Sequence, residues 1–249
     1  MLFRSRIGTG VLLLVNAFQL AWPAFAYSIK DDDEARRTYA AVMGVYLAFM
    51  GWAALTVALL APWFLRLLTT EPYWGAAAAI TPIAIAGPLY GAYFIAAIGV
   101  GRRKANQFNW VVVAAAAVVE VVALLVLVPP FGVVGAGWAL VIAYGTMFAL
   151  MLWREHRVFT VPYAWGRIVR VPIVLAFAFA ATLLVPDAGA GWLVVRILIA
   201  AAIPLGYVAI GFLTRAEIER AKAIVRGLRS RGGAAPPGDT AEPEPDEEI

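Results

Sequence analysis

The sequence predicts an all-α integral membrane protein with about seven transmembrane helices. Hydrophobic residues make up 63% of the 249 residues and charged residues only 14%, and the mean hydropathy is +0.81. A water-soluble domain is usually about half apolar and about a quarter charged, so a globule of this size could not bury so much apolar surface. The composition therefore excludes a cytosolic enzyme, a secreted disulfide scaffold and a disordered chain.

Apolar stretches that are long enough to cross a hydrocarbon core, which takes about 20 residues, justify the predicted helices one by one. In chain order they run over residues 7–26, 39–60, 74–100, 110–128, 133–153, 168–185 and 192–213. Prolines inside them do not exclude helices, because neighbouring helices and water satisfy the freed carbonyls in a membrane. The stretches are continuously apolar, whereas the strands of a membrane barrel alternate apolar and polar residues.

Small and helix-breaking residues separate the fourth stretch from the fifth. Pro129 and Pro130 lack two backbone N–H groups and predict that one span ends in a short turn outside the membrane. The small residues Gly132, Gly135, Ala136 and Gly137 predict that the following helix approaches a neighbour closely.

The distribution of Lys and Arg predicts which loops are cytoplasmic. If the C-terminus is cytoplasmic, 16 of the 20 Lys and Arg residues lie in cytoplasmic segments, 3 lie outside, and Arg196 lies within the last stretch near its outer end. Residues 101–108, 154–167 and the tail from Thr214 onward are then cytoplasmic. Seven spans place the N-terminus outside, although Arg4 and Arg6 favour the inside.

Two explanations of that conflict remain open. Residues 1–6, 11–20 and 24–26 have the basic, apolar and small-residue regions of a cleavable signal peptide, and cleavage would leave six spans. Alternatively, the chain is the C-terminal half of a longer protein, and its N-terminal half is missing or separately encoded. The count of Lys and Arg favours the second explanation.

The motifs at residues 101–104 (Gly-Arg-Arg-Lys) and 128–136 (Val-Pro-Pro-Phe-Gly-Val-Val-Gly-Ala), with the aromatic and basic loop that starts at Trp153, form a recognisable pattern. The pattern resembles the C-terminal half of polysaccharide (O-antigen-type) flippases of the multidrug/oligosaccharidyl-lipid/polysaccharide exporter superfamily. The resemblance covers about residues 7–213 and implies spans eight to fourteen of a fourteen-span fold. The eighth span of that fold begins outside, as the charges of this chain require.

Polar residues within spans are costly in lipid and tend to face a cavity, so they are the candidate substrate contacts. Asn16 and Gln19 share a helical face and could bind sugar hydroxyls, or they could join helices. Tyr90 and Tyr93 share a face of the third stretch and could stack on sugars, or they could pack with other rings. Glu120, near the middle of the fourth stretch, could bind a sugar, couple transport to protons or sodium, or pack as a hydrogen-bonded acid.

Charged residues outside the spans carry two further hypotheses. Arg102, Arg103 and Lys104 form a cytoplasmic cationic cluster that could attract a polyprenyl diphosphate, or that serves topology and anionic-lipid contact. The acidic run at residues 31–34 lacks calcium-ligand spacing and predicts a solvated loop. Arg196 is expected to reach the outer headgroups.

The tail divides into two parts after the transmembrane bundle of residues 1–213. A capping pattern begins at Thr214, and apolar residues at helical spacing predict a basic amphipathic helix over residues 214–231. Residues 232–249 are rich in Gly, Ala and Pro, then acidic, and predict a disordered tail.

The inventory of reactive residues leaves little material for catalysis. There is no cysteine, His156 is the only histidine, and the sequence has no nucleotide-binding glycine loop. We therefore expect no catalytic residues, metal or cofactor, and no nucleic-acid partner.

The resemblance implies that the full protein moves polyprenyl-diphosphate-linked oligosaccharide or polysaccharide precursors across the bacterial inner membrane, among membrane lipids, by alternating access. Because that mechanism needs two bundles, the chain alone is expected not to transport. Two alternatives remain: a membrane enzyme of polysaccharide assembly, such as a polymerase or ligase, and a multidrug exporter of the same superfamily. The short outer loops near residues 66–73, 129–132 and 186–191 hold few charged residues for enzyme chemistry.

Overall fold

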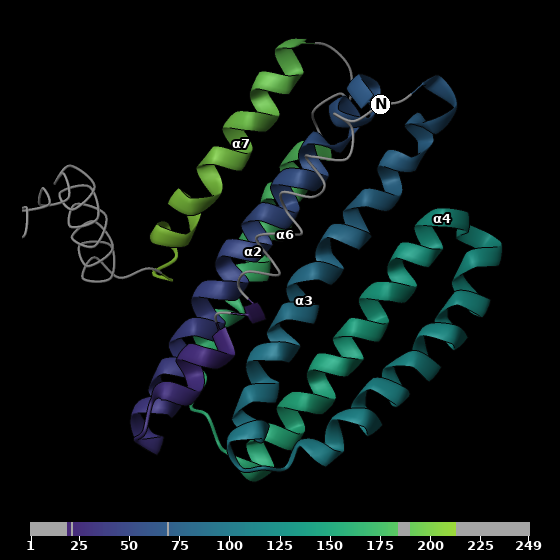
Figure 1. Cartoon of the computed structure of the whole chain (residues 1–249). Helices are drawn as coiled ribbons and strands as arrows, with labels where there is room; N and C mark the ends of the chain where they lie inside the picture. Colours follow the sequence, from purple (N-terminus) through teal and green to yellow (C-terminus); the bar gives the residue numbers. More distant parts are fainter. Residues whose placement is uncertain (1–18, 21, 69, 184–189, 213–249) are drawn as a thin grey trace, which may run out of the picture. The chain divides into compact units, whose positions relative to one another are not determined.

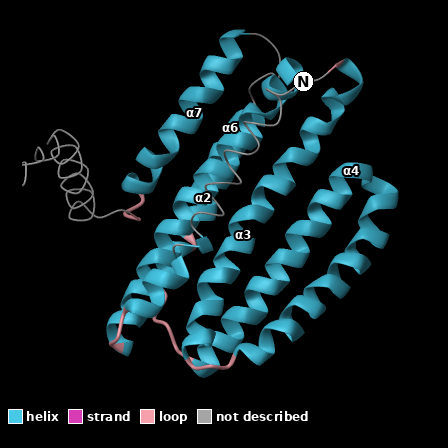
Figure 2. Cartoon of the chain, in the orientation of Figure 1, coloured by secondary structure: helices cyan, strands magenta, loops and turns pink. Residues whose placement is uncertain are grey.

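A computed structural model describes residues 19–20, 22–68, 70–183 and 190–212, and the regular secondary structure in these ranges is entirely helical (Figure 1, Figure 2). Residues 22–28 form a helical segment. The elements after it are α2 (Asp32–Leu68), the 3-10 helix η1 (Glu71–Ala76), α3 (Ala77–Arg102), the 3-10 helix η2 (Asn106–Phe108), α4 (Asn109–Val158), α5 (Trp165–Ile168), α6 (Arg170–Leu183) and α7 (Ala190–Ala209).

Four helices in these ranges are long and apolar enough to cross a membrane: α2, α3, α4 with the preceding η2, and α7. They mark the chain as a helical, membrane-embedded protein, because backbone N–H and C=O groups in lipid must be satisfied within the chain. The second, fourth and fifth predicted stretches fall within α2 and α4, and the third falls on η1 and α3. The sixth and seventh fall mostly on α6 and α7, and the 14-residue α6 is not among the four long helices. Most of the first stretch, and both parts of the tail, lie outside the described residues.

Helix α4 contains two of the predicted stretches and reverses direction between them (Figure 1). A straight helix of its 50 residues would be about 75 Å long, more than twice the hydrocarbon core. The reversal occurs at Gly132, where φ is 56° and ψ is −133°, a backbone conformation that glycine adopts without a Cβ clash. We call residues 109–131 the first arm of α4 and residues 133–158 the second arm.

The predicted turn over residues 129–132 was partly wrong. The helical path continues through Pro129 and Pro130 and turns only at Gly132. Proline loses a hydrogen bond but keeps a helical φ, so it weakens the last turn of the arm without ending it. Gly132 has no other group within 4 Å of an added Cβ, so its part is the turn and not packing.

Small residues bring α3 and the two arms of α4 together. A Cβ at Gly137 would lie 2.6 Å from Cγ of Pro82 in α3, and one at Gly135 would overlap the backbone carbonyl of Leu127 in the first arm. The close packing predicted at these two glycines is therefore confirmed.

Helices α2 and α7 are joined by side chains that bond to carbonyls of the facing helix. The indole N–H of Trp52 donates to the carbonyl of Ala200 at 2.8 Å. The hydroxyl of Tyr207 donates to the carbonyl of Ala48 at 3.2 Å. Such bonds between helices hold a bundle together in lipid. Apolar side chains contact lipid tails about as favourably as they contact another helix, so apolar contact alone gives little association.

Arg196 belongs to the same contact, and the prediction that it reaches the outer headgroups was wrong. Its side chain is buried, with a relative exposure of 7%. The guanidinium donates to the carbonyl of Leu59 in α2 at 3.2 Å and lies 5.1 Å from the ring centroid of Trp63. A facing carbonyl and an aromatic face together replace part of the water that a headgroup position would supply.

Candidate functional site

A group of stacked aromatic rings lies where α3 packs against the second arm of α4. Tyr90 and Tyr93 stack with ring centroids 6.4 Å apart, as their shared helical face predicts. Phe94 meets Tyr90 edge to face at 4.9 Å. Tyr144, from the second arm, lies 4.9 Å from Tyr90. We call these four residues the aromatic cluster.

Glu120 lies on the first arm of α4. Its carboxylate lies close enough to Tyr144 to act electrostatically on the phenol hydroxyl. The side chain is half-buried, and among the described residues it forms no hydrogen bond or ion pair. The fold thus brings Tyr90 and Tyr93 together with Tyr144, which lies within electrostatic range of Glu120.

The other two predicted cavity residues do not join this group in the part of the chain that is described. Asn16 lies outside the described residues, and Gln19 is half-buried in a helical position near the start of the described chain. Tyr144 is a member of the cluster that sequence analysis missed. Its position near the middle of a stretch, away from the interfacial aromatics, was the signal that could have identified it.

The cluster combines two kinds of recognition chemistry. Aromatic faces stack on the apolar faces of rings and attract cations, and tyrosine hydroxyls both donate and accept hydrogen bonds. An ionised carboxylate accepts several hydrogen bonds, for example from hydroxyl groups, and no group on the described chain saturates Glu120. A polyhydroxylated ring or a small cation therefore fits the site better than an anion.

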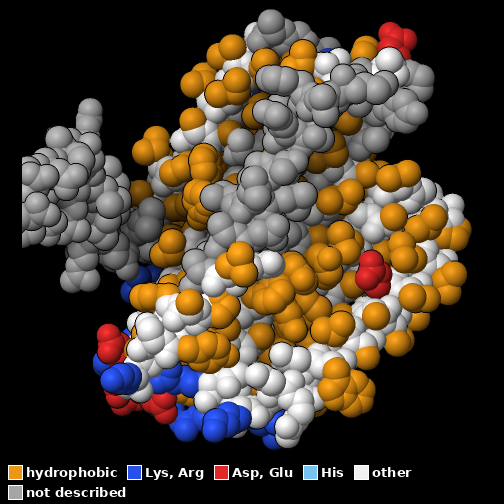
Figure 3. All heavy atoms as spheres, viewed as in Figure 1, with side chains coloured by type: hydrophobic (Ala, Val, Ile, Leu, Met, Phe, Trp, Pro, Cys, Tyr) orange, Lys and Arg blue, Asp and Glu red, His pale blue; other side chains and the backbone are white. Residues whose placement is uncertain are grey.

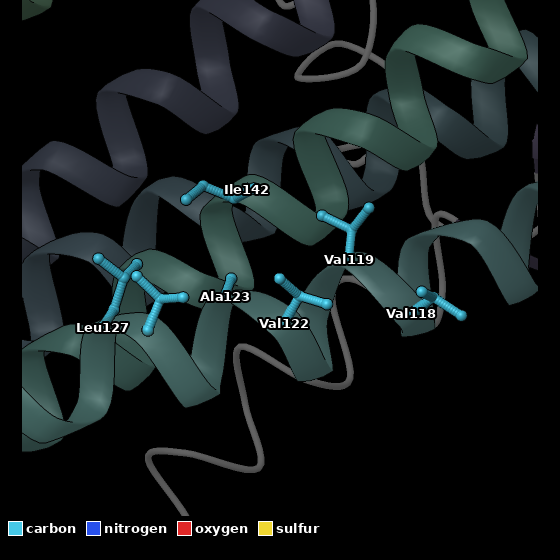
Figure 4. Close-up of a pocket in the computed structure, with 7 residues that line it drawn as sticks. Val118, Val119, Val122, Ala123, Leu127 and Ile142 are labelled. Carbon is cyan, nitrogen blue, oxygen red and sulfur yellow. The ribbon is translucent and has the colours of Figure 1, made fainter.

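An apolar groove runs between the two arms of α4. It has a volume of about 370 Å³ and is lined by hydrocarbon side chains, of which Ile142 comes from the second arm and the others from the first (Figure 4). The lining residues are Val118, Val119, Val122, Ala123, Val126, Leu127 and Ile142. Glu120 is not among them, so the groove and the aromatic cluster are separate features.

Charged residues gather at the end of the bundle where α2 begins and α3 ends (Figure 3). Arg102, the last residue of α3, donates from Nε to Oδ1 of Asp32 at 2.7 Å. Its terminal nitrogens donate to the carbonyls of Ile29 and Lys30 at 2.7 and 2.9 Å. Arg103 donates to the other oxygen of Asp32 at 2.9 Å. The two arginines of the predicted cationic cluster thus fasten the turn before α2 to the end of α3.

The third member of the cationic cluster, Lys104, differs from the two arginines. Its side chain is exposed and its backbone has a φ of 56°. Contact with a diphosphate would therefore have to come mainly from Lys104, because Arg102 and Arg103 already bond to Asp32 and to backbone carbonyls.

The prediction of a solvated loop at residues 31–34 was partly wrong: the acidic run is mostly exposed, but Asp32 to Glu34 form the first turn of α2. Asp31 caps the first turn of α2, because its Oδ2 accepts the backbone N–H of Glu34 at 2.8 Å. Asp33 pairs with Arg36 at 2.9 Å within the same helix. Acidic groups at a helix N-terminus also interact favourably with the helix dipole.

A short segment between α4 and α5 packs against this charged end. We call residues 159–164 the strap. Phe159 begins it and has a relative exposure of only 1%. Three guanidinium groups surround its ring, with Arg36 at 5.0 Å, Arg103 at 5.6 Å and Arg102 at 5.9 Å from the centroid. The strap is therefore anchored at its first residue by cation–π contacts.

A buried carboxyl anchors the other end of the strap. Glu155, near the end of the second arm, has a relative exposure of 1%, and its Oε2 accepts the hydroxyl of Tyr163 at 2.7 Å. Its Oε1 is buried without a hydrogen-bond partner. Burial, and next the neighbouring carboxyl, raises the pKa of Tyr163 far above its usual value, so this hydroxyl keeps its proton and remains a donor.

Glu155 was also missed by sequence analysis. Arg154 and Arg157 lie beside it in the sequence, which is typical of a solvated basic loop. Helical geometry turns those arginines outward onto aromatic rings, Arg154 over Phe108 and Arg157 over Trp153, while Glu155 turns inward. A glycine opposite it, Gly99 in α3, leaves room for the carboxyl, because an added Cβ would collide with it.

No family model, no curated protein and no solved structure matches this chain. The fold and its side chains define a class, a helical membrane-embedded protein. Its helices carry the aromatic cluster and Glu120, and the strap packs against its charged end.

Proposed function

We propose that this chain is the C-terminal part of a flippase that moves lipid-linked oligosaccharide or polysaccharide precursors across the bacterial inner membrane. The observation that carries the proposal is the aromatic cluster with Glu120. Stacked phenol rings, and a carboxylate without a hydrogen-bond partner within apolar helices, suit a polyhydroxylated ligand. Such a ligand offers flat apolar faces and many hydroxyl donors. A polar side chain within a membrane-spanning helix is costly unless it contacts a ligand or faces a cavity.

In this proposal the chain has about seven spans and a cytoplasmic C-terminus, as the distribution of Lys and Arg favours. It works with an N-terminal half that supplies the second bundle. The ligand then moves when the two bundles rock around a site between them. The aromatic cluster lies on this chain's share of that site.

The binding test uses the full chain in lipid nanodiscs and a polyprenyl-diphosphate-linked oligosaccharide as the probe. Quenching of tyrosine and tryptophan fluorescence reports binding. We expect Glu120→Gln and Tyr90→Leu each to weaken binding about tenfold, which corresponds to about 1.4 kcal/mol. Val118→Ala, on the same arm but in the apolar groove, is the matched control and should bind as the unaltered chain does.

Two outcomes of this test would contradict the proposal. One is unchanged affinity of both variants at unchanged protein levels, which leaves the cluster with packing alone. The other is equal binding of polyprenyl diphosphate without the glycan, which removes sugar recognition from the site.

The orientation has its own test. An alkaline phosphatase reporter fused after Thr160 should be inactive in cells, because this enzyme folds only outside the cytoplasm and the segment 154–167 is basic. A fusion after Pro130 should be active and serves as the control. Strong activity after Thr160 would overturn the layout.

A further inference from the structure

Glu155 holds a carboxyl in surroundings that suit an acid and not its anion. One oxygen accepts a single hydroxyl bond from Tyr163, and the other is buried with no partner. An ionised carboxylate presents about four lone-pair sites and needs several donors or a cation. Burial without them favours the neutral form.

The charged groups on the elements around Glu155 either contact other groups or are exposed. At the end of α3, Arg102 and the following residue Arg103 bond to Asp32. From α2, Arg36 pairs with Asp33. On α4 itself, Arg154 and Arg157 lie over aromatic rings and His156 is exposed. Within the described ranges no cation forms an ion pair with Glu155, and Tyr163 is the titratable side chain that bonds to it.

The strap depends on this carboxyl. Tyr163 is tied to Glu155, Phe159 lies under the three arginines, and Val161 between them is buried, with a relative exposure of 6%. By contrast, Thr160 and Pro162 are exposed. Loss of the Glu155 contact would free the end of the strap that leads into α5.

The geometry points to a proton-binding site at Glu155, in which the bound proton keeps the strap closed over the ends of α3 and α4. In the closed state the carboxyl is neutral and accepts the Tyr163 hydroxyl. In the open state the O–H bond of the acid breaks, the proton passes to water, and the carboxylate leaves its pocket against Gly99 to become hydrated. The ligand is a proton, and the site does not depend on which substrate the protein moves.

The test follows exposure of the strap with a thiol. The chain has no cysteine, so Val161→Cys gives a single buried reporter and Thr160→Cys a single exposed reference. The full chain in nanodiscs reacts with a water-soluble maleimide at about pH 6 and about pH 9. Dividing the rate at position 161 by the rate at position 160 removes the effect of pH on the thiol itself.

We expect this ratio to rise at least about tenfold between the two pH values in the unaltered background. Glu155→Gln, which cannot ionise, should hold the ratio low at both. His156→Gln removes the adjacent exposed histidine and should keep the full rise.

A ratio that does not change with pH in the unaltered background would overturn the inference, and so would a rise that persists in Glu155→Gln. Abolition of the rise by His156→Gln would assign the switch to the histidine instead. If Glu155→Gln failed to fold, its ratio would be high even at about pH 6. The Glu155→Met variant, which fills the same space without a polar atom, would then take its place and should also show no rise.

Discussion

Glu120 lies on the first arm of α4 and Glu155 near the end of the second, and the two carboxyls differ in burial, partners and surroundings. Glu120 is half-buried beside a stack of phenols and forms no hydrogen bond or ion pair in the described chain. Glu155 is fully buried, bonded to Tyr163 and seated against a glycine. A half-buried polar group without a hydrogen-bond partner is available to a ligand. A buried polar group that is bonded within the protein helps to hold the fold in place.

The regions around the two carboxyls differ in the same way. The end of the bundle near Glu155 contains the ion pairs of Asp32, the cation–π contacts of Phe159 and the strap. The region near Glu120 contains aromatic packing and apolar helix faces. We therefore expect substitutions at the charged end to cost stability, and substitutions in the aromatic cluster to affect ligand binding with little change in stability.

The largest effect is expected for Gly99→Ala. The new methyl group would collide with the carboxyl of Glu155, whose Cγ and Cδ lie 3.0 Å from the position of the added Cβ. Overpacking of this kind costs about 2 to 3 kcal/mol in free energy of unfolding. Gly87→Ala, on the same helix with open space around the added Cβ, is the control and should be neutral or slightly stabilising. Equal effects of the two changes, measured by unfolding in mixed micelles, would show that the pocket for Glu155 is not tight.

A smaller loss is expected for Arg102→Ala. This change removes three hydrogen bonds that fasten the turn before α2, and it leaves Asp32 with Arg103 alone. Since water replaces part of what is lost at a partly exposed site, we expect a decrease of about 2 kcal/mol in free energy of unfolding. Arg37→Ala, an exposed arginine one turn into α2, should change the same quantity by less than about 0.5 kcal/mol. Comparable losses would mean that charge in general, and not this bonding, stabilises the end.

The smallest effect on stability is expected for Glu120→Gln. The carboxyl is half-buried and has no bond to lose, so the free energy of unfolding should change by less than about 0.5 kcal/mol. The same micelle measurement checks it, with Glu155→Gln run beside it as the buried counterpart. A large loss at Glu120 would place this residue among the groups that hold the fold and would remove the contrast between the two carboxyls.

Much of the fold could be predicted from the sequence, because hydropathy and helix-breaking residues are properties of short stretches. The four long described helices fall where apolar stretches predict them, and the reversal of α4 lies within a few residues of Pro129 and Pro130. The shared face of Tyr90 and Tyr93 also follows from helical spacing alone. These features need no knowledge of what lies opposite.

Only the tertiary structure determined which groups the charged and polar side chains contact. Arg196 turned out to be buried against α2, Arg102 and Arg103 to be bonded to Asp32, and Glu155 to be enclosed beside Gly99. The sequence by itself determined that this chain forms apolar helices with a basic end, since each helix satisfies its own backbone. Whether a given carboxyl or guanidinium meets water, a carbonyl or an opposite charge depends on the facing helix, which is distant in the sequence and is brought near only by packing.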